Sequence, residues 1–173
     1  YVIASDMLYP FPNIENMLKE AGVKDISRKR KAGFSIVDGI KVYRLPHIIE
    51  YADFILVKGL KKTLEKIRPS LVFAHESRQG LPALAAYHKN KFKYKLVVDQ
   101  HDFYHKIPNY AWLKKLARFL DYFLFRKFIV DYSLKMADSI IAVTNETKDF
   151  LIKTHKIGPE RIFLVPLGVD TDF

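Results

Sequence analysis

Short apolar runs alternate with longer amphipathic stretches along this 173-residue chain, and this alternation limits the fold more than any other feature. The runs with the composition of strands are Tyr1–Ser5, Leu71–His75, Lys95–Asp99, Ser139–Val143 and Arg161–Val165. The stretches with a helical period are Asn13–Ala21, His47–Ile67, Gln79–Lys91, Asn109–Met136 and Glu146–His155. Strands this apolar are buried on both faces, and repeated strand–helix–strand units form a parallel sheet with right-handed crossovers. The sequence therefore predicts an α/β fold with a doubly wound, mostly parallel, Rossmann-like sheet.

A hairpin signal and a linker signal refine this organisation. The β-rich runs between Phe34 and Leu45 flank Asp38-Gly39, a dipeptide that suits a two-residue hairpin turn. After the last predicted strand, residues 166–173 contain Pro166 and Gly168, which is typical of the approach to a linker. The length fits one domain. We therefore expect a single Rossmann-like domain over residues 1–173, with 166–173 beginning the linker to a C-terminal domain.

The formal net charge of +10 favours anionic partners. The alternative is a solvated basic surface from a heat-adapted source, which the low glutamine content also indicates. No nucleic-acid reader motif accompanies the charge, so nucleic acid is not expected as a partner. The sequence has no cysteine, no visible signal peptide and no uncharged stretch of membrane-spanning length. We expect a cytoplasmic protein, peripheral on the inner face of the membrane if its anionic partner is lipid.

Polar side chains gather directly after the predicted strands, where open parallel sheets bind their ligands. They are Glu76, Arg78, Gln100, His101, Asp102 and Glu146. His101 is the leading catalytic candidate among them, with a purely structural histidine as the alternative. Farther along, Thr144 or Asn145 can cap the start of a helix, and the first amides of that helix can alternatively bind an anion.

The motifs of several common enzyme classes are absent. Neither G-x-S-x-G nor G-x-G-x-x-G nor G-x-x-x-x-G-K-[ST] occurs, which argues against a hydrolase and against an autonomous NAD or ATP site. His75, His101 and His105 lack the spacing of a helical or cysteine-supported zinc site. We therefore expect neither a cofactor nor a metal.

Six segments carry a resemblance to a known family. They are Asp38–Pro46, Ile67–His75, Gly80–Ala86, Leu96–Asp102, Met136–Val143 and Ile162–Asp170. In this order and spacing, the chain resembles the N-terminal domain of family-4 glycosyltransferases, which have the two-domain GT-B fold. The resemblance implies an enzyme of the hexosyltransferase type that moves a sugar from a nucleotide-sugar donor to an acceptor, with retention of configuration and without a metal. Most donor contacts would lie in the C-terminal domain, so this chain alone is expected to be inactive.

The resemblance also implies roles for individual residues. His101 matches the histidine that approaches the transferred sugar. The acceptor, a saccharide or a lipid-linked molecule, would be lined by Glu76, Ser77, Arg78, Gln100 and Asp102. The donor-side loops would contribute Tyr9, Pro10, Asn145 and Glu146. The family's Gly-Gly pair after the first strand is missing, because Tyr9-Pro-Phe-Pro12 runs into Asn13 without a glycine. Either this loop is altered or residues are missing from it.

A predicted helix within Pro108–Val130 combines aromatic and basic side chains. Its apolar stripe is typical of a helix packed on a sheet. The alternative is an interfacial helix on an anionic membrane. Its membrane-surface residues would be Trp112, Lys114, Lys115 and Arg118. The matching alternative function is a non-catalytic basic α/β module that binds an anionic membrane or a polyanion.

Overall fold

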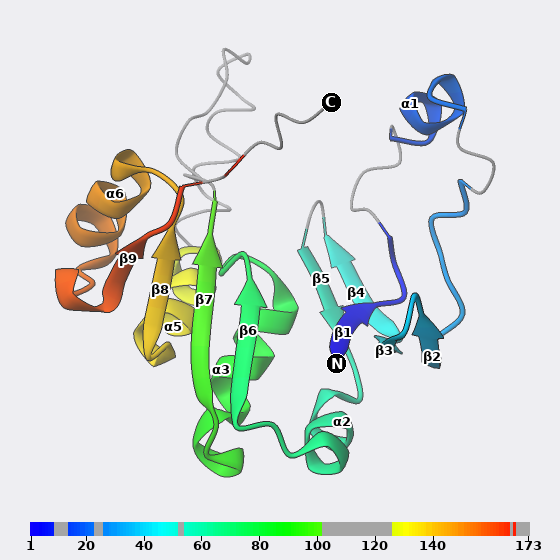
Figure 1. Cartoon of the computed structure of the whole chain (residues 1–173), viewed down its shortest axis with the longest axis horizontal. Coiled ribbons are helices and arrows are strands. Elements are labelled where there is room, and N and C mark those ends of the chain that lie inside the picture. The colour runs from blue at the N-terminus through cyan, green and yellow to red at the C-terminus, as the bar shows by residue number, and fades with distance from the viewer. Residues whose placement is uncertain (9–13, 23–25, 52–53, 102–125, 167, 169–173) are drawn as a thin grey trace. The chain divides into compact units, whose positions relative to one another are not determined.

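The structure, a computed structural model, describes residues 1–173 except 9–13, 23–25, 52–53, 102–125, 167 and 169–173 (Figure 1). It has the predicted α/β fold, with helices and a four-stranded parallel sheet. Two compact units make up the chain: Tyr1–Arg68 with Gln79–Leu81, and Pro69–Arg78 with Pro82–Phe173. None of the helices in the described ranges is long and apolar enough to cross a membrane.

The first unit contains a three-stranded sheet in the order β1-β3-β2. Its strands are β1 (Val2–Ser5), β2 (Gly33–Val37) and β3 (Ile40–Leu45). β1 runs parallel to β3, whereas β2 and β3 form the predicted antiparallel hairpin. The turn residues Asp38 and Gly39 have φ angles of 49° and 78°, and a type I′ turn requires positive φ at both positions. The first predicted helix is present as α1 (Ile14–Glu20).

The helix predicted over His47–Ile67 is wrong in its first half. This segment forms the antiparallel strands β4 (His47–Tyr51) and β5 (Phe54–Val57), followed by helix α2 (Leu60–Ile67). Isoleucine, tyrosine, phenylalanine and valine are frequent in the two strands, and such β-branched and aromatic side chains favour paired strands. Gly59 precedes the helix at φ 94°, a conformation that glycine adopts without steric cost.

The second unit is built on a sheet in which each strand runs parallel to its neighbour. Its strands, in spatial order, are β6 (Leu71–His75), β7 (Lys95–Gln100), β8 (Ser139–Ala142) and β9 (Ile162–Leu164). The helical elements between them are α3 (Gly80–Phe92), α5 (Lys127–Met136), α6 (Asn145–His155) and the 3-10 turn η2 (Pro159–Arg161). In Figure 1, α3 and α5 lie behind the sheet. Of the long helix predicted over Asn109–Met136, α5 is present, and the part before residue 126 lies outside the described residues.

The core of this unit packs helices against one face of the sheet. Among the described residues, the leucine, isoleucine and valine side chains with no exposed surface are Leu96, Val98, Leu134, Ile140 and Leu151. Burial of one such side chain stabilises a fold by about 1.5–3 kcal/mol. On β7 the buried positions are residues 96, 98 and 100, and successive side chains of a strand point to opposite faces. Asp99 therefore lies on the face of β7 opposite to Leu96 and Val98.

Candidate functional site

The candidate site lies at the carboxyl ends of β6 and β7, which are neighbours in the sheet. The parallel register pairs His75, the last residue of β6, with Asp99 of β7. The next residue, Glu76, has a φ angle of 62° and turns the chain sharply at the end of β6. Its amide donates a hydrogen bond of 2.8 Å to the Asp99 carbonyl, which fixes the turn to the neighbouring strand. A non-glycine residue at positive φ is strained, and such strain is frequent at functional sites.

The turn places the Glu76 carboxylate under the backbone of His101. Glu76 is buried, and its Oε1 accepts a hydrogen bond of 3.0 Å from the His101 amide. Its Oε2 lies 3.6 Å from Nε of Arg78, with which it forms an ion pair. A carboxylate that accepts a backbone amide makes a stronger hydrogen bond than a neutral acceptor does. Glu76 therefore fixes the His101 backbone and holds Arg78 at the rim.

Ser77 and Gln100 form the buried floor of the site. The Ser77 hydroxyl donates to Gln100 Oε1 over 2.6 Å, and the Ser77 amide reaches the same oxygen over 3.3 Å. Gln100 Nε2 donates to Glu76 Oε2 over 3.5 Å. Ser77 is completely buried and Gln100 is 6% exposed, so their polar groups form hydrogen bonds within the protein and not with solvent. The structure thus brings together five of the predicted residues, Glu76, Ser77, Arg78, Gln100 and His101, and two of these are interior supports.

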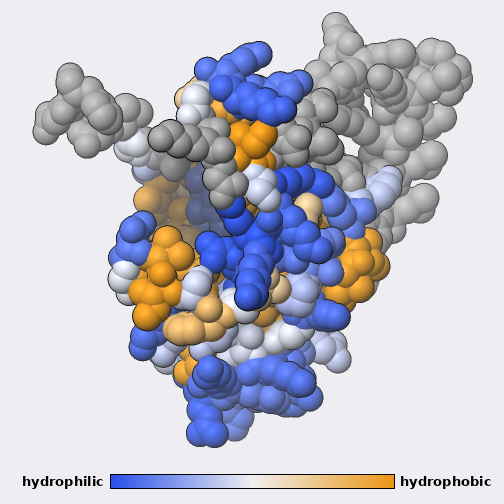
Figure 2. All heavy atoms as spheres, turned by 90° about the vertical axis from the view of Figure 1, so that its right-hand side faces the viewer, coloured by the Kyte–Doolittle hydropathy of each residue, from blue (hydrophilic) through white to orange (hydrophobic). Residues whose placement is uncertain are grey.

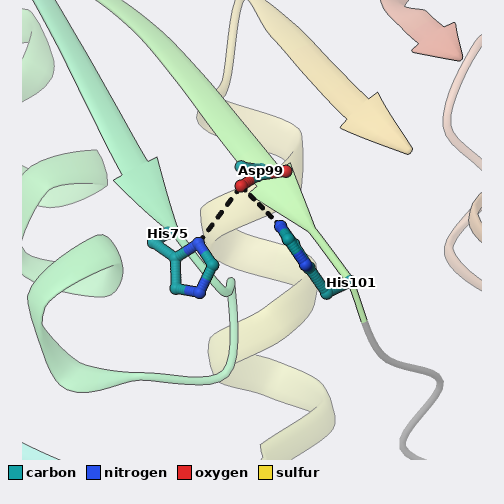
Figure 3. Close-up of side chains that lie close together, drawn as sticks. All are labelled: His75, Asp99 and His101. Carbon is teal, nitrogen blue, oxygen red and sulfur yellow. Dashed lines mark hydrogen bonds and ion pairs between the residues drawn. The ribbon is translucent and has the colours of Figure 1, made fainter. Parts of the chain in front are cut away.

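A second layer of contacts holds the imidazole of His101 (Figure 3). Its Nε2 lies 2.7 Å from Oδ2 of Asp99, and the same oxygen lies 3.1 Å from Nδ1 of His75. The two rings meet edge to face, with centroids 4.7 Å apart. The Asp99 side chain is 13% exposed, that of His101 28% and that of His75 66%. One carboxylate oxygen therefore orients two imidazoles, one at the surface and one partly enclosed.

Sequence reasoning did not include His75 and Asp99 among the site residues. A signal for both exists: residues 99 and 101 are two apart, so in an extended strand they share a face. His75 ends the strand before β7, and in a parallel pair such ends lie at one edge. The sequence predicts Asp99 as the last residue of an apolar strand, and its position next to two histidines depends on the register of β6 and β7.

The contact with Asp99 fixes the orientation of the His101 ring. When Nε2 donates its proton to Asp99, Nδ1 is the acceptor nitrogen of the ring. With the ring held by Asp99 and the backbone held by Glu76, His101 can present a fixed polar group to a ligand at the sheet edge.

The other predicted site residues fall into two groups. Asn145 and Glu146 begin α6 directly after β8, the strand next to β7, and both are exposed. Thr144 caps this helix, because its Oγ1 accepts a hydrogen bond of 3.1 Å from the Thr147 amide. The helix start expected at Thr144 or Asn145 is thus confirmed. Outside the described residues lie Tyr9, Pro10, Asp102, Trp112, Lys114, Lys115 and Arg118.

A parallel sheet with its polar residues at the carboxyl ends of two neighbouring strands defines the class of α/β domains that bind small ligands at this edge. Within that class, the model of the family described as Glycosyltransferase Family 4 matches residues 22–173 of the chain. The chain belongs to this family, as its resemblance predicted, and membership supports a glycosyltransferase-type function acting on sugar-related substrates. No curated protein gave a significant match.

Proposed function

We propose that this chain forms the acceptor side of a retaining glycosyltransferase, which moves a hexosyl group from a nucleotide-sugar donor to a saccharide or lipid-linked acceptor. One observation carries the proposal: in a family-4 chain, His101 is fixed by two carboxylates, through its amide by Glu76 and through its ring by Asp99. Such double fixation is unnecessary for a surface histidine. It is what a group needs when it must meet a substrate atom in one orientation.

In this proposal His101 orients the donor sugar and stabilises the positive charge that develops at its anomeric carbon. Its backbone carbonyl and its ring are both candidates for the contact, because both are positioned by the same pair of carboxylates. Preorganised polar groups stabilise a transition state without reorganising during the reaction. His101 therefore acts by orientation and electrostatics, and not as a general base.

Arg78 is the residue on this rim best suited to the acceptor. Its side chain is 25% exposed and is paired with Glu76, whose carboxylate is 10% exposed. A guanidinium held in this way can donate to the hydroxyl or phosphate oxygens of an acceptor. Ser77 and Gln100 support this pair from below. Most donor contacts, including those to the leaving diphosphate, belong in this proposal to a second domain after residue 173.

The test uses the protein extended beyond residue 173 and a panel of UDP-, GDP- and ADP-sugars, with and without lipid acceptors. His101→Ala should lower turnover about 100-fold, within the range observed when one preorganised polar group is removed from an active site. His88→Ala is the matched control, since His88 lies within α3 and its ring contacts Tyr87 and Phe92. Equal turnover of His101→Ala and the parent protein, with both folded, would overturn the role of the His101 ring and leave only the backbone carbonyl, which alanine retains.

A second candidate function is a basic module that binds an anionic membrane or polyanion. The net charge of +10 favours it, and the β2–β3 hairpin adds exposed apolar side chains, with Phe34 52% and Ile36 63% exposed. Figure 2 shows a face of the molecule that is mostly hydrophilic with separate apolar patches. In the same panel of assays, absence of turnover together with salt-sensitive liposome binding by the 173-residue chain would select this function.

A further inference from the structure

His75, Asp99 and His101 bring three metal-binding groups to one point of the sheet edge. Each residue offers one ligand atom, a ring nitrogen or a carboxylate oxygen, and the three atoms all lie within 4.8 Å of one another. Figure 3 shows both imidazoles beside the carboxylate, one from the end of β6 and one just after β7. A helical or cysteine-supported zinc site has a characteristic spacing in the sequence. This cluster has no such spacing, because its groups come from two adjacent parallel strands.

The distances between these atoms are close to those in a metal site. Bonds of about 2.0–2.1 Å to a tetrahedral ion place the ligand atoms about 3.3–3.4 Å apart. Asp99 Oδ2 lies 2.7 Å from His101 Nε2 and 3.1 Å from His75 Nδ1. To reach that spacing the first separation must widen by about 0.6–0.7 Å and the second by about 0.2–0.3 Å. Replacing two hydrogen bonds by metal bonds therefore requires small side-chain movements and no change in the strands.

The backbone around the cluster is already fixed. The β6–β7 register sets His75 opposite Asp99, and the Glu76 carboxylate holds the His101 amide at 3.0 Å. Few side-chain rotations remain to be ordered when an ion binds, so the entropic cost of assembling these ligands is small. The exposed side chain of His75, at 66%, gives an ion access from solvent and leaves room for water in the fourth position.

The donor set selects the kind of ion. Two imidazole nitrogens and one carboxylate suit Zn²⁺, Co²⁺ or Ni²⁺, whereas Mg²⁺ and Ca²⁺ prefer oxygen ligands throughout. The positive net charge of the chain opposes any cation, but exposed charges are largely screened beyond about 8 Å at physiological ionic strength. Among the described residues, the Glu76 carboxylate lies next to the cluster, where it accepts the His101 amide and pairs with Arg78.

We propose that His75 Nδ1, Asp99 Oδ2 and His101 Nε2 form a binding site for a divalent transition-metal ion of the zinc type, and that the bound ion inhibits sugar transfer. The inhibition rests on the proposed function, because the ion takes the ring nitrogen and the carboxylate that orient His101. The binding itself does not depend on that function.

Binding is tested on the 173-residue chain alone, by titrating Zn²⁺ in competition with a chromophoric chelator. We expect one Zn²⁺ per chain. His75→Ala and Asp99→Asn should each weaken binding at least about tenfold, since even loss of an outer partner of a metal ligand costs 10–100-fold in affinity. His88→Ala should bind as the parent chain does. Because His75 is mostly exposed, His75→Ala should keep the thermal melting of the parent chain, which separates loss of a ligand from loss of fold.

The cobalt complex provides an independent readout. Co²⁺ bound by two nitrogens and one carboxylate oxygen should give visible absorption bands of a four-coordinate ion, and these should disappear in Asp99→Asn. No Zn²⁺ binding by the folded parent chain, or parent-like affinity in His75→Ala, would overturn the proposed site.

Inhibition is tested separately on the extended protein. Micromolar Zn²⁺ should lower turnover of the parent protein, and His75→Ala should be at least about tenfold less sensitive. Tight binding without inhibition would overturn the inhibitory role and leave the site intact. Absence of turnover in metal-free buffer would count against the proposed function and would leave the binding result unaffected.

Discussion

Glu76 combines a strained backbone with a buried carboxylate, and substitutions can separate the two contributions. Its φ angle is 62°, and a side chain in this region costs about 1 kcal/mol relative to glycine. The carboxylate accepts the His101 amide at 3.0 Å and pairs with Arg78, and a hydrogen bond to a charged group contributes about 1.5–3 kcal/mol. Glu76→Ala should therefore lower the free energy of unfolding by about 1.5–3 kcal/mol. Glu76→Gly, which also relieves the strain, should be about 1 kcal/mol more stable than Glu76→Ala.

Lys93 provides the matched control for the backbone contribution. It has a φ angle of 55° in the exposed connection between α3 and β7. Lys93→Ala should have almost no effect, whereas Lys93→Gly should stabilise the chain by about 1 kcal/mol, as expected for glycine at positive φ. Urea denaturation followed by circular dichroism measures the free energy of unfolding of all four variants under the same conditions. Parent-like stability of Glu76→Ala would refute the role of the carboxylate. Equal stability of the alanine and glycine variants at position 76 would refute the strain.

Two further predictions concern the second unit. Leu96 is completely buried, so Leu96→Ala should lower the free energy of unfolding by about 2–5 kcal/mol, whereas Leu71→Ala, at a side chain that is 56% exposed, should cost less than about 1 kcal/mol in the same urea assay. Similar losses in the two variants would contradict the assigned core. Burial lowers the pKa of His155 below its ordinary value, although its hydrogen bond with Asp131 opposes this shift. The unfolded chain therefore binds more protons than the folded one as the pH falls below about 6.5, so stability should decrease on acidification, and His155→Gln should flatten that dependence. Stability should fall a second time as the pH drops below the ordinary pKa of aspartate. Burial raises the pKa of Asp131, but the hydrogen bonds from His155 and Lys127 outweigh burial and lower this pKa overall. Stability that is constant from pH 7 to 5 would contradict the assignment to His155.

The sequence predicts the second unit well because local composition and long-range packing agree there. Its strands are short apolar runs bounded by polar residues, and the end of β6 at His75 coincides with the prediction. The helix predicted from His47 is wrong because an approximate helical period competes there with β-branched and aromatic residues that favour paired strands. Its outcome depends on the pairing of β4 with β5, and that pairing is not a local property of either run.

The site is predicted in the same uneven way. The rule that ligands bind after strands finds Glu76, Arg78 and His101, because it needs only the position of each strand end. It assigns Gln100 to the rim, whereas the structure buries this side chain against Ser77. The rule omits Asp99, because the contact of Asp99 with His75 depends on which strand lies beside β7. Register and neighbour identity are properties of the assembled sheet, and they decide which polar residues meet.

The pairing of His75 with Asp99 has a consequence for how this domain can vary during evolution. The two strands that build the site are joined by α3 and its flanking turns, over residues 76–94, yet they meet directly through the sheet. The length and surface of the connection after Arg78 can therefore change without altering the β6–β7 register or the hydrogen bond between Glu76 and His101. Insertions there can add new loops at this edge of the sheet, whereas a one-residue deletion inside either strand would change the register that pairs His75 with Asp99.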